Sequence, residues 1–368
     1  MRMLTWAMVV ALAMSGSIPD PAPPVWGGEL LSAPAPVAEL PEWDEVVAVP
    51  PSLRAQLDTQ VLQHSWTSQQ RMRRIVEFML DPDGLALRYD LDTTRTVAET
   101  FRDRQGNCVS FTLTFVALAR EAGLDAYVQE ADEALVWLQG GGMMFYAGHV
   151  NAGVRIGGRR YVVDFERNVV ATSTPPEAIS DQRALSHWYN NRGAERLMGG
   201  DIPGARSLLE ASVELEPDFV PAWNNLGVLR LRSGEPEAAE RAYLVALEHK
   251  PEHVPTLSNL TGLYQQLGEK DELARYQRKL RDVQRSDPYR NFVLGFQHES
   301  QGDNAQALAY YERAIGLHGR EPRFFIAAAR IHTELGHLEE AERSLQRARA
   351  LSGDSDRDIS RTGFRVRR

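Results

Sequence analysis

The sequence predicts an α+β domain with a small antiparallel sheet, followed by an all-α solenoid of helical pairs. Two patterns indicate this organisation. Between about residues 94 and 168, an apolar run with helical spacing is followed by segments typical of β-strands. From about residue 186 onward, glycines and alanines recur every 34 residues, a period typical of stacked helix–turn–helix units.

The composition limits the classes of protein that the chain can represent. It has 368 residues, so we expect more than one hydrophobic core. Its 43% hydrophobic and 25% charged residues are typical of a soluble globular protein. The formal net charge of −9 argues against a broad basic surface for nucleic acid. Five arginines near the end form a short basic tail over residues 354–368, which we interpret as a solvated end.

The first 17 residues have the features of a secretion signal: one positive charge, a short apolar stretch and then small residues. The apolar stretch is shorter than the ~20 residues that span a bilayer, although an uncleaved N-terminal anchor stays an alternative. Residues 18–50 are rich in proline and alanine, which predicts an extended linker. We therefore expect an exported protein, in a bacterial periplasm or anchored to the inner membrane and facing the periplasm.

Cys108 is the only cysteine, so no internal disulfide can form. Apolar residues recur at helical spacing from Cys108 to Gly123, which predicts a helix that begins at the cysteine. A thiol in the first helical turn faces unpaired backbone N–H groups and the positive end of the helix dipole, and both favour the thiolate. We therefore expect a functional thiol; the alternative is a buried, small apolar side chain.

A β-hairpin is predicted downstream, with strands at about residues 147–156 and 159–165 and a turn at Gly157-Gly158. In this register Asp164 is a diagonal neighbour of His149 on the same face of the sheet, within reach of an imidazole–carboxylate hydrogen bond. A shift of one residue would move Asp164 to the other face. The hairpin therefore predicts a His–Asp pair.

Cys108, His149 and Asp164 are the candidate catalytic residues, because a nucleophile, its base and a group that orients the base follow one another in this order. Other interpretations stay open for each residue. His149 suits a buried core histidine, and Asp164 suits a cap of a strand end or a turn. A Cys–His–Asp zinc site is a further alternative, but no close pair of ligands supports it.

In the second half, five glycines recur at intervals of 34 residues: Gly200, Gly234, Gly268, Gly302 and Gly336. This part, residues 183–353, resembles about five tetratricopeptide repeats, whose paired helices pack closely and turn at a glycine. The third repeat departs from the pattern. Thr261 replaces a glycine, Leu273 replaces an alanine, and the second helix is expected to continue to about Arg285.

Three asparagines, Asn191, Asn225 and Asn259, occupy the same position in three successive repeats. Such amides can bind a peptide backbone through paired hydrogen bonds, which makes them candidate protein-binding residues. The alternative is that asparagine is simply common at this position. The basic residues that bind peptide carboxylates in some such repeats are replaced here by Asn190, Ala194, Asn224 and Val228.

Four segments carry a second resemblance: Thr96–Cys108, Gly123–Ala126, Gly148–Val150 and Val163–Asp164. Their order resembles the transglutaminase-like (papain-like) superfamily, which implies such a core over residues 51–182. The resemblance implies that Cys108 is the nucleophile, His149 its proton shuttle and Asp164 the orienting acid. Many members have an aromatic residue two positions after the histidine, where this chain has Asn151, and this leaves the substrate preference open.

The predicted function is an exported thiol enzyme, a cysteine peptidase or amidase, that cleaves or transfers at amide bonds while the repeats recruit a protein or peptide. The Cys108 N–H and Gln105 are candidate donors to the oxyanion. The first alternative is a protein-binding scaffold whose first domain is catalytically silent, and the second is a crosslinking transglutaminase. We expect no cofactor, no metal and no nucleic acid, and membrane contact only through the N-terminal segment.

Overall fold

The computed structural model describes residues 40–90, 93–138, 143–165, 169–172, 176–352 and 365–367. These residues form two compact units. The first contains the described residues up to Val128 and those from Ala178 to Ala274, and the second contains Gln129–Glu177 and the described residues from Arg275 onward. The predicted signal, most of the linker, the glycines at 140–142 and most of the tail lie outside the described residues. The predicted domain boundaries stay predictions.

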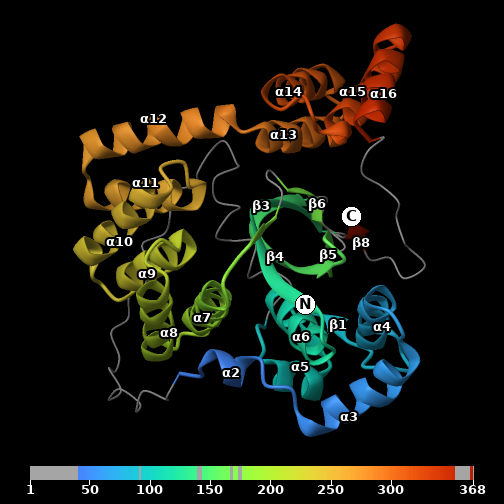
Figure 1. The fold of residues 1–368 in the computed structure, drawn as a ribbon. Coiled ribbons are helices and arrows are strands. Elements are labelled where there is room, and N and C mark those ends of the chain that lie inside the picture. Colours follow the sequence, from blue (N-terminus) through green and yellow to red (C-terminus); the bar gives the residue numbers. More distant parts are fainter. Residues whose placement is uncertain are drawn as a thin grey trace. The chain divides into compact units, whose positions relative to one another are not determined.

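The first unit begins with a group of short elements around one apolar helix. These are α2 (Trp43–Val46), α3 (Pro51–Gln60), η1 (Leu62–His64), α4 (Ser68–Leu80), β1 (Arg88–Tyr89), α5 (Val97–Asp103), β2 (Gln105–Gly106) and α6 (Cys108–Glu121). Helix α6 is buried without interruption from Val109 to Ala119 and contacts α3, α4 and α5 (Figure 1). None of the described helices is long and apolar enough to cross a membrane.

Thr67 starts α4 anew after η1, because its side chain accepts a hydrogen bond from the backbone of Gln70 in a capping box. One expectation for this part is corrected. The end of the predicted linker is not extended. It forms α2, whose Val46 is fully buried, and the Pro41 carbonyl accepts a hydrogen bond from the Tyr189 hydroxyl.

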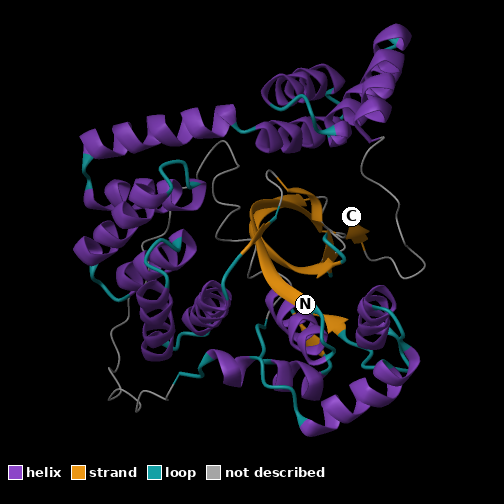
Figure 2. Ribbon diagram, in the orientation of Figure 1, coloured by secondary structure: helices purple, strands orange, loops and turns teal. Residues whose placement is uncertain are grey.

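The sheet contains β3 (Asp125–Leu138), β4 (Met143–Ile156), β5 (Arg159–Asp164), β6 (Val169–Thr172), β7 (Glu177–Ala178) and β8 (Arg365–Arg367). The strand order is β6-β3-β4-β5-β8, with β7 also paired to β3, and Figure 2 shows the strands as the minor part of the fold. β4 and β5 pair from Ile156↔Arg159 to Ala152↔Val163, which confirms the predicted hairpin register.

β3 is one continuous strand. One feature of the sheet differs from the expectation. The basic tail is not entirely a solvated end, because its residues 365–367 form β8 and pair with β5. An edge strand presents unpaired N–H and C=O groups, and a short additional strand satisfies them.

Four of the predicted helical pairs form: α7 (Asp181–Met198) with α8 (Ile202–Leu215), α9 (Val220–Arg232) with α10 (Pro236–His249), α13 (Pro288–Ser300) with α14 (Asn304–Leu317), and α15 (Pro322–Glu334) with α16 (Leu338–Ser352). The third repeat contributes α11 (Val254–Leu267) and α12 (Lys270–Ser286). The five turn glycines all have positive φ, from 74° to 82°, which explains their spacing. The first two pairs and α11 lie in the first unit, and the last two pairs lie in the second.

A second set of glycines allows the helices of a pair to approach closely. A Cβ at Gly193 would lie 2.7 Å from Leu209, and one at Gly295 would lie 2.6 Å from Tyr311. The third repeat has Thr261 at the equivalent position, and its second helix α12 has only one buried residue, Tyr276. The predicted departure of the third repeat, including the extension of α12 to Ser286, is confirmed.

Candidate functional site

Cys108 is the first residue of α6, as the sequence predicts. Asn107 caps the helix, because its side-chain oxygen accepts the Ser110 backbone N–H at 3.1 Å. The chain before the cap requires glycine, since a Cβ at Gly106 would lie 2.5 Å from the Ser110 Cβ. Cys108 is half-buried, and Gln105 lies three residues before it in β2, paired with Arg88 of β1. The thiol therefore lies in the first turn of a firmly capped helix.

His149 of β4 and Asp164 of β5 form the predicted pair. The His149 Nε2 atom lies 2.9 Å from both carboxylate oxygens of Asp164. The imidazole is 4% exposed, so this carboxylate fixes the ring in a largely dry environment. Asn151 adds an amide at 3.4 Å from Asp164 Oδ2. A carboxylate on one ring nitrogen holds the imidazole in one orientation.

The structure therefore brings together two of the three predicted catalytic residues. Cys108 belongs to the first unit, and His149 and Asp164 belong to the second. The catalytic roles of all three residues stay predictions. Among the described residues, no group of three His, Cys, Asp or Glu side chains can hold a metal ion.

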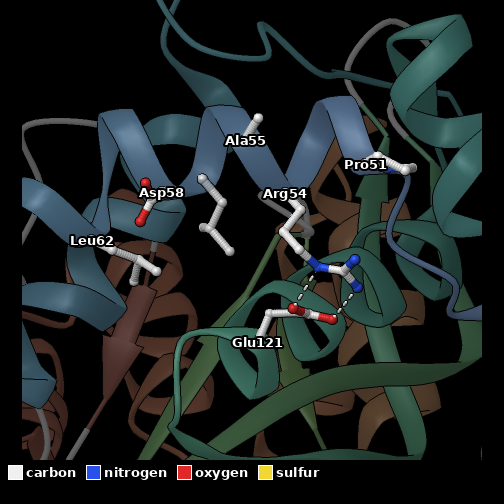
Figure 3. Close-up of a pocket in the computed structure, with 7 residues that line it drawn as sticks. Pro51, Arg54, Ala55, Asp58, Leu62 and Glu121 are labelled. Carbon is white, nitrogen blue, oxygen red and sulfur yellow. Dashed lines mark hydrogen bonds and ion pairs between the residues drawn. The ribbon is translucent and has the colours of Figure 1, made fainter.

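A surface pocket of about 530 Å³ lies in the first unit (Figure 3). It is lined by Pro51, Arg54, Ala55, Leu57, Asp58, Leu62 and Glu121. Arg54 and Glu121 close one wall through two hydrogen bonds of 2.8 and 2.7 Å (Figure 3). Glu121 ends α6, whereas Cys108 begins it, and the 14 residues of this helix span roughly 20 Å. None of the predicted site residues lines the pocket.

The three predicted peptide-binding asparagines belong to a continuous chain of side-chain amides. Asn225 of α9 donates to Asn190 of α7 at 2.9 Å, and Asn259 of α11 donates to Asn224 of α9 at 3.0 Å. Within each pair of neighbours, Asn190 donates to Asn191 and Asn224 donates to Asn225. We call these five residues the amide chain. It joins the first helices of three successive repeats within the first unit.

A partly buried histidine is connected to the amide chain through Thr256. The Thr256 hydroxyl donates to Asn224 Oδ1 at 3.1 Å, and His253 Nδ1 lies 2.7 Å from that hydroxyl. Because the hydroxyl proton points to Asn224, His253 is assigned as the Nδ1–H donor to Thr256. Burial, with a smaller contribution from Lys250, lowers the pKa of His253 to about 4, so its ring is neutral near neutral pH.

Asn190, Asn224 and Thr256 were not predicted as members of the site. Asn190 and Asn224 are each 6% exposed, whereas Asn191 and Asn225 are half-buried. Buried amides seldom contact a ligand, and here they hold the more exposed amides in place. The signal for Asn190 and Asn224 was present in the sequence as two Asn-Asn pairs separated by one 34-residue period.

Comparison with protein-family models identifies the class of the repeats. Two models, both described as tetratricopeptide repeat, match residues 184–253 and 299–359. These matched segments consist of tetratricopeptide repeats, which confirms the repeat part of the predicted fold. The matches do not reach residues 51–182, where the transglutaminase-like core stays a prediction. No curated protein matches the chain.

Some solved structures show a distant likeness. The structure described as MamA MSR-1 C2 is 20% identical, with a TM-score of 0.25, and the match covers 46% of this chain and 97% of that chain. A second, described as YrrB, a TPR protein with an unusual peptide-binding site, is 16% identical, with a TM-score of 0.26 and coverage of 46% and 87%. These scores support no inference about the function of this chain.

Proposed function

We propose that the chain binds a protein or peptide on its tetratricopeptide repeats, and that the more exposed members of the amide chain, Asn191, Asn225 and Asn259, form the contact surface. The observation that carries this proposal is the set of hydrogen bonds that fixes Asn225 and Asn259 from one helix to the next. A side chain held in place before the ligand arrives loses little conformational entropy on binding. Repeats of this class are suited to protein recognition, because they expose long surfaces formed by successive helices.

The chemistry of the amide chain fits the backbone of an extended peptide. A carboxamide has two N–H donors and an oxygen with two lone pairs, and each of these asparagines uses only part of this capacity within the chain. An extended peptide presents N–H and C=O groups along its length. In some such repeats a basic residue binds the terminal carboxylate of a peptide, but the equivalent positions here are occupied by Asn190 and Asn224. We therefore propose an internal peptide segment as the ligand.

Substitution of Asn225 tests this proposal. A library of random peptides of about 12 residues is selected against the full chain, and the best peptide is titrated by fluorescence anisotropy. Asn225→Ala is expected to weaken its Kd by about tenfold, because one hydrogen-bonding amide is lost and its neighbours in the amide chain are released.

The matched control for this titration is Asn304→Ala. Asn304 also donates a side-chain hydrogen bond between two helices, to Glu334, but it lies outside the amide chain. An unchanged Kd is expected for this variant. Unchanged affinity for both Asn225→Ala and Asn259→Ala would contradict the proposed contact surface.

A second function is favoured by the short contact between His149 and Asp164. We propose thiol chemistry at an amide bond of an exported protein or peptide. The Cys108 thiolate attacks the amide carbonyl, and the tetrahedral oxyanion accepts hydrogen bonds from the Cys108 N–H and Gln105. His149 protonates the departing amine while Asp164 holds its ring. Water then hydrolyses the thioester in a peptidase or amidase, whereas an amine takes its place in a crosslinking enzyme.

Covalent labelling tests the second function, because Cys108 is the only thiol and one adduct is unambiguous by mass. We expect iodoacetamide to modify Cys108 at neutral pH about tenfold faster than free cysteine, and His149→Ala to remove this advantage. His64→Ala, in an exposed part of η1, is the control and should react like the wild type. Equally slow alkylation of Cys108 in the wild type and in His149→Ala would contradict the proposed thiol chemistry. Protein binding would then be the function that the structure supports.

A further inference from the structure

Thr94 connects the first repeat helix to the helix that carries Cys108. Its side chain is fully buried, and its hydroxyl oxygen accepts the Asn107 side-chain amide at 2.7 Å. Its backbone N–H donates to Glu195 Oε1 of α7 at 2.6 Å, and its carbonyl accepts from Arg192 of α7 at 3.2 Å. Both backbone polar groups of Thr94 therefore form hydrogen bonds with α7, while its side chain forms one with Asn107, the cap of α6.

The first turn of α6 is bound to the same loop. Asn107 Oδ1 accepts both the Ser110 backbone N–H and the Ser110 hydroxyl at 3.1 Å. The Ser110 hydroxyl oxygen in turn accepts the Arg95 backbone N–H at 2.8 Å. Ser110 is fully buried, and Asn107 is 6% exposed. Cys108 lies between these two residues, so its backbone position follows the loop at 94–95.

The two α7 side chains that hold Thr94 form an ion pair with each other. Arg192 lies 3.4 Å from Glu195 Oε2, and its guanidinium lies over the Trp188 ring at 5.6 Å from the centroid. Burial raises the pKa of Glu195, while the hydrogen bonds from Thr94 and the charge of Arg192 act in the opposite direction. A carboxyl group that is largely removed from water requires a hydrogen-bond donor, and the Thr94 N–H supplies one to Glu195.

We infer that Glu195 and Arg192 are positioning residues for Cys108, so that the first tetratricopeptide repeat sets the geometry of the thiol-bearing turn. The catalytic consequence of this inference rests on the proposed thiol chemistry. The connection from α7 through Thr94 to the cap of α6 rests only on the hydrogen bonds of Thr94. Loss of the Glu195 acceptor leaves the Thr94 N–H buried without a partner. The loop then moves, and the Asn107 cap of α6 moves with it.

Two variants of Glu195 in the full chain test the inference. Glu195→Ala removes the acceptor, whereas Glu195→Gln keeps an oxygen at the same place. Amide hydrogen exchange of residues 107–111 is expected to rise about tenfold in Glu195→Ala and to stay within about twofold of the wild type in Glu195→Gln. The rate of Cys108 alkylation, measured from about pH 6 to about pH 9, is expected to change in the alanine variant alone. Glu237→Ala, an exposed residue of α10, is the control.

The outcomes separate this inference from the thiol proposal. Wild-type exchange of residues 107–111 in Glu195→Ala would overturn the inference, whatever the reactivity of Cys108. A slow wild-type thiol combined with raised exchange in Glu195→Ala would overturn the thiol proposal and support the positioning role. If Glu195→Ala does not fold, Thr94→Val replaces it, because it breaks only the bond to Asn107. Unchanged exchange of residues 107–111 in that variant would also overturn the inference.

Discussion

Replacement of Gly227 by alanine is expected to destabilise the second helical pair by about 2–3 kcal/mol, the cost of overpacking a buried contact. A Cβ at Gly227 would overlap the ring of Tyr243. That ring is 1% exposed and packed between α9 and α10, so it has no free space to enter. Alanine gains about 1 kcal/mol over glycine in helix propensity, which is smaller than the steric cost. The net effect is therefore a loss of stability.

Gly262→Ala is the matched control for this substitution. Gly262 also lies inside a helix of the repeats, but a Cβ there meets no atom within 4 Å. We expect a gain of about 0.5–1 kcal/mol from helix propensity alone. Urea unfolding of the full chain, followed by circular dichroism, measures both variants. A gain in stability in Gly227→Ala would contradict the close packing of α9 and α10.

A loss of stability in mild acid is expected from His253. Its pKa in the folded protein is about 4, whereas an exposed histidine in an unfolded chain titrates near pH 6.5. Between these values the unfolded chain binds a proton at this site and the folded chain does not, so stability falls as the pH decreases. By about pH 5 the loss from this group amounts to about 2 kcal/mol.

His253→Gln isolates this contribution from the carboxylates that titrate in the same range. Glutamine does not titrate, and its amide N–H can donate to Thr256 in place of the imidazole. The difference in unfolding free energy between wild type and variant is measured at about pH 7, 6 and 5. We expect the variant to gain relative to the wild type at each step. A constant difference across this range would show that His253 is not buried in its neutral form.

The repeats and the hairpin were predictable because their determinants are local in the sequence. A positive-φ glycine at every 34th residue fixes each turn of the solenoid. The turn at Gly157-Gly158 sets the register, and that register brings Asp164 to His149. The start of α6 at Cys108 follows in the same way from the Asn107 cap.

Features that depend on contacts between distant segments were not predictable. The pairing of β8 with β5 joins residues about 200 positions apart. The three residues of β8 are too few to give a strong strand pattern in the sequence. The amide chain requires Asn190 of α7 and Asn225 of α9 to lie within hydrogen-bond distance of each other. Their separation in the sequence does not predict this contact. The support of Thr94 by Glu195 is likewise a contact between elements 101 residues apart.

Side-chain amide NMR of the asparagines tests the central claim, peptide binding on the amide chain, most directly. The peptide selected against the full chain is added to a sample with labelled asparagine. We predict that the side-chain NH2 signals of Asn225 and Asn259 shift on titration, with the Asn304 signal unchanged. Binding of the peptide without a shift at Asn225 or Asn259 would contradict the account and place the ligand elsewhere on the chain.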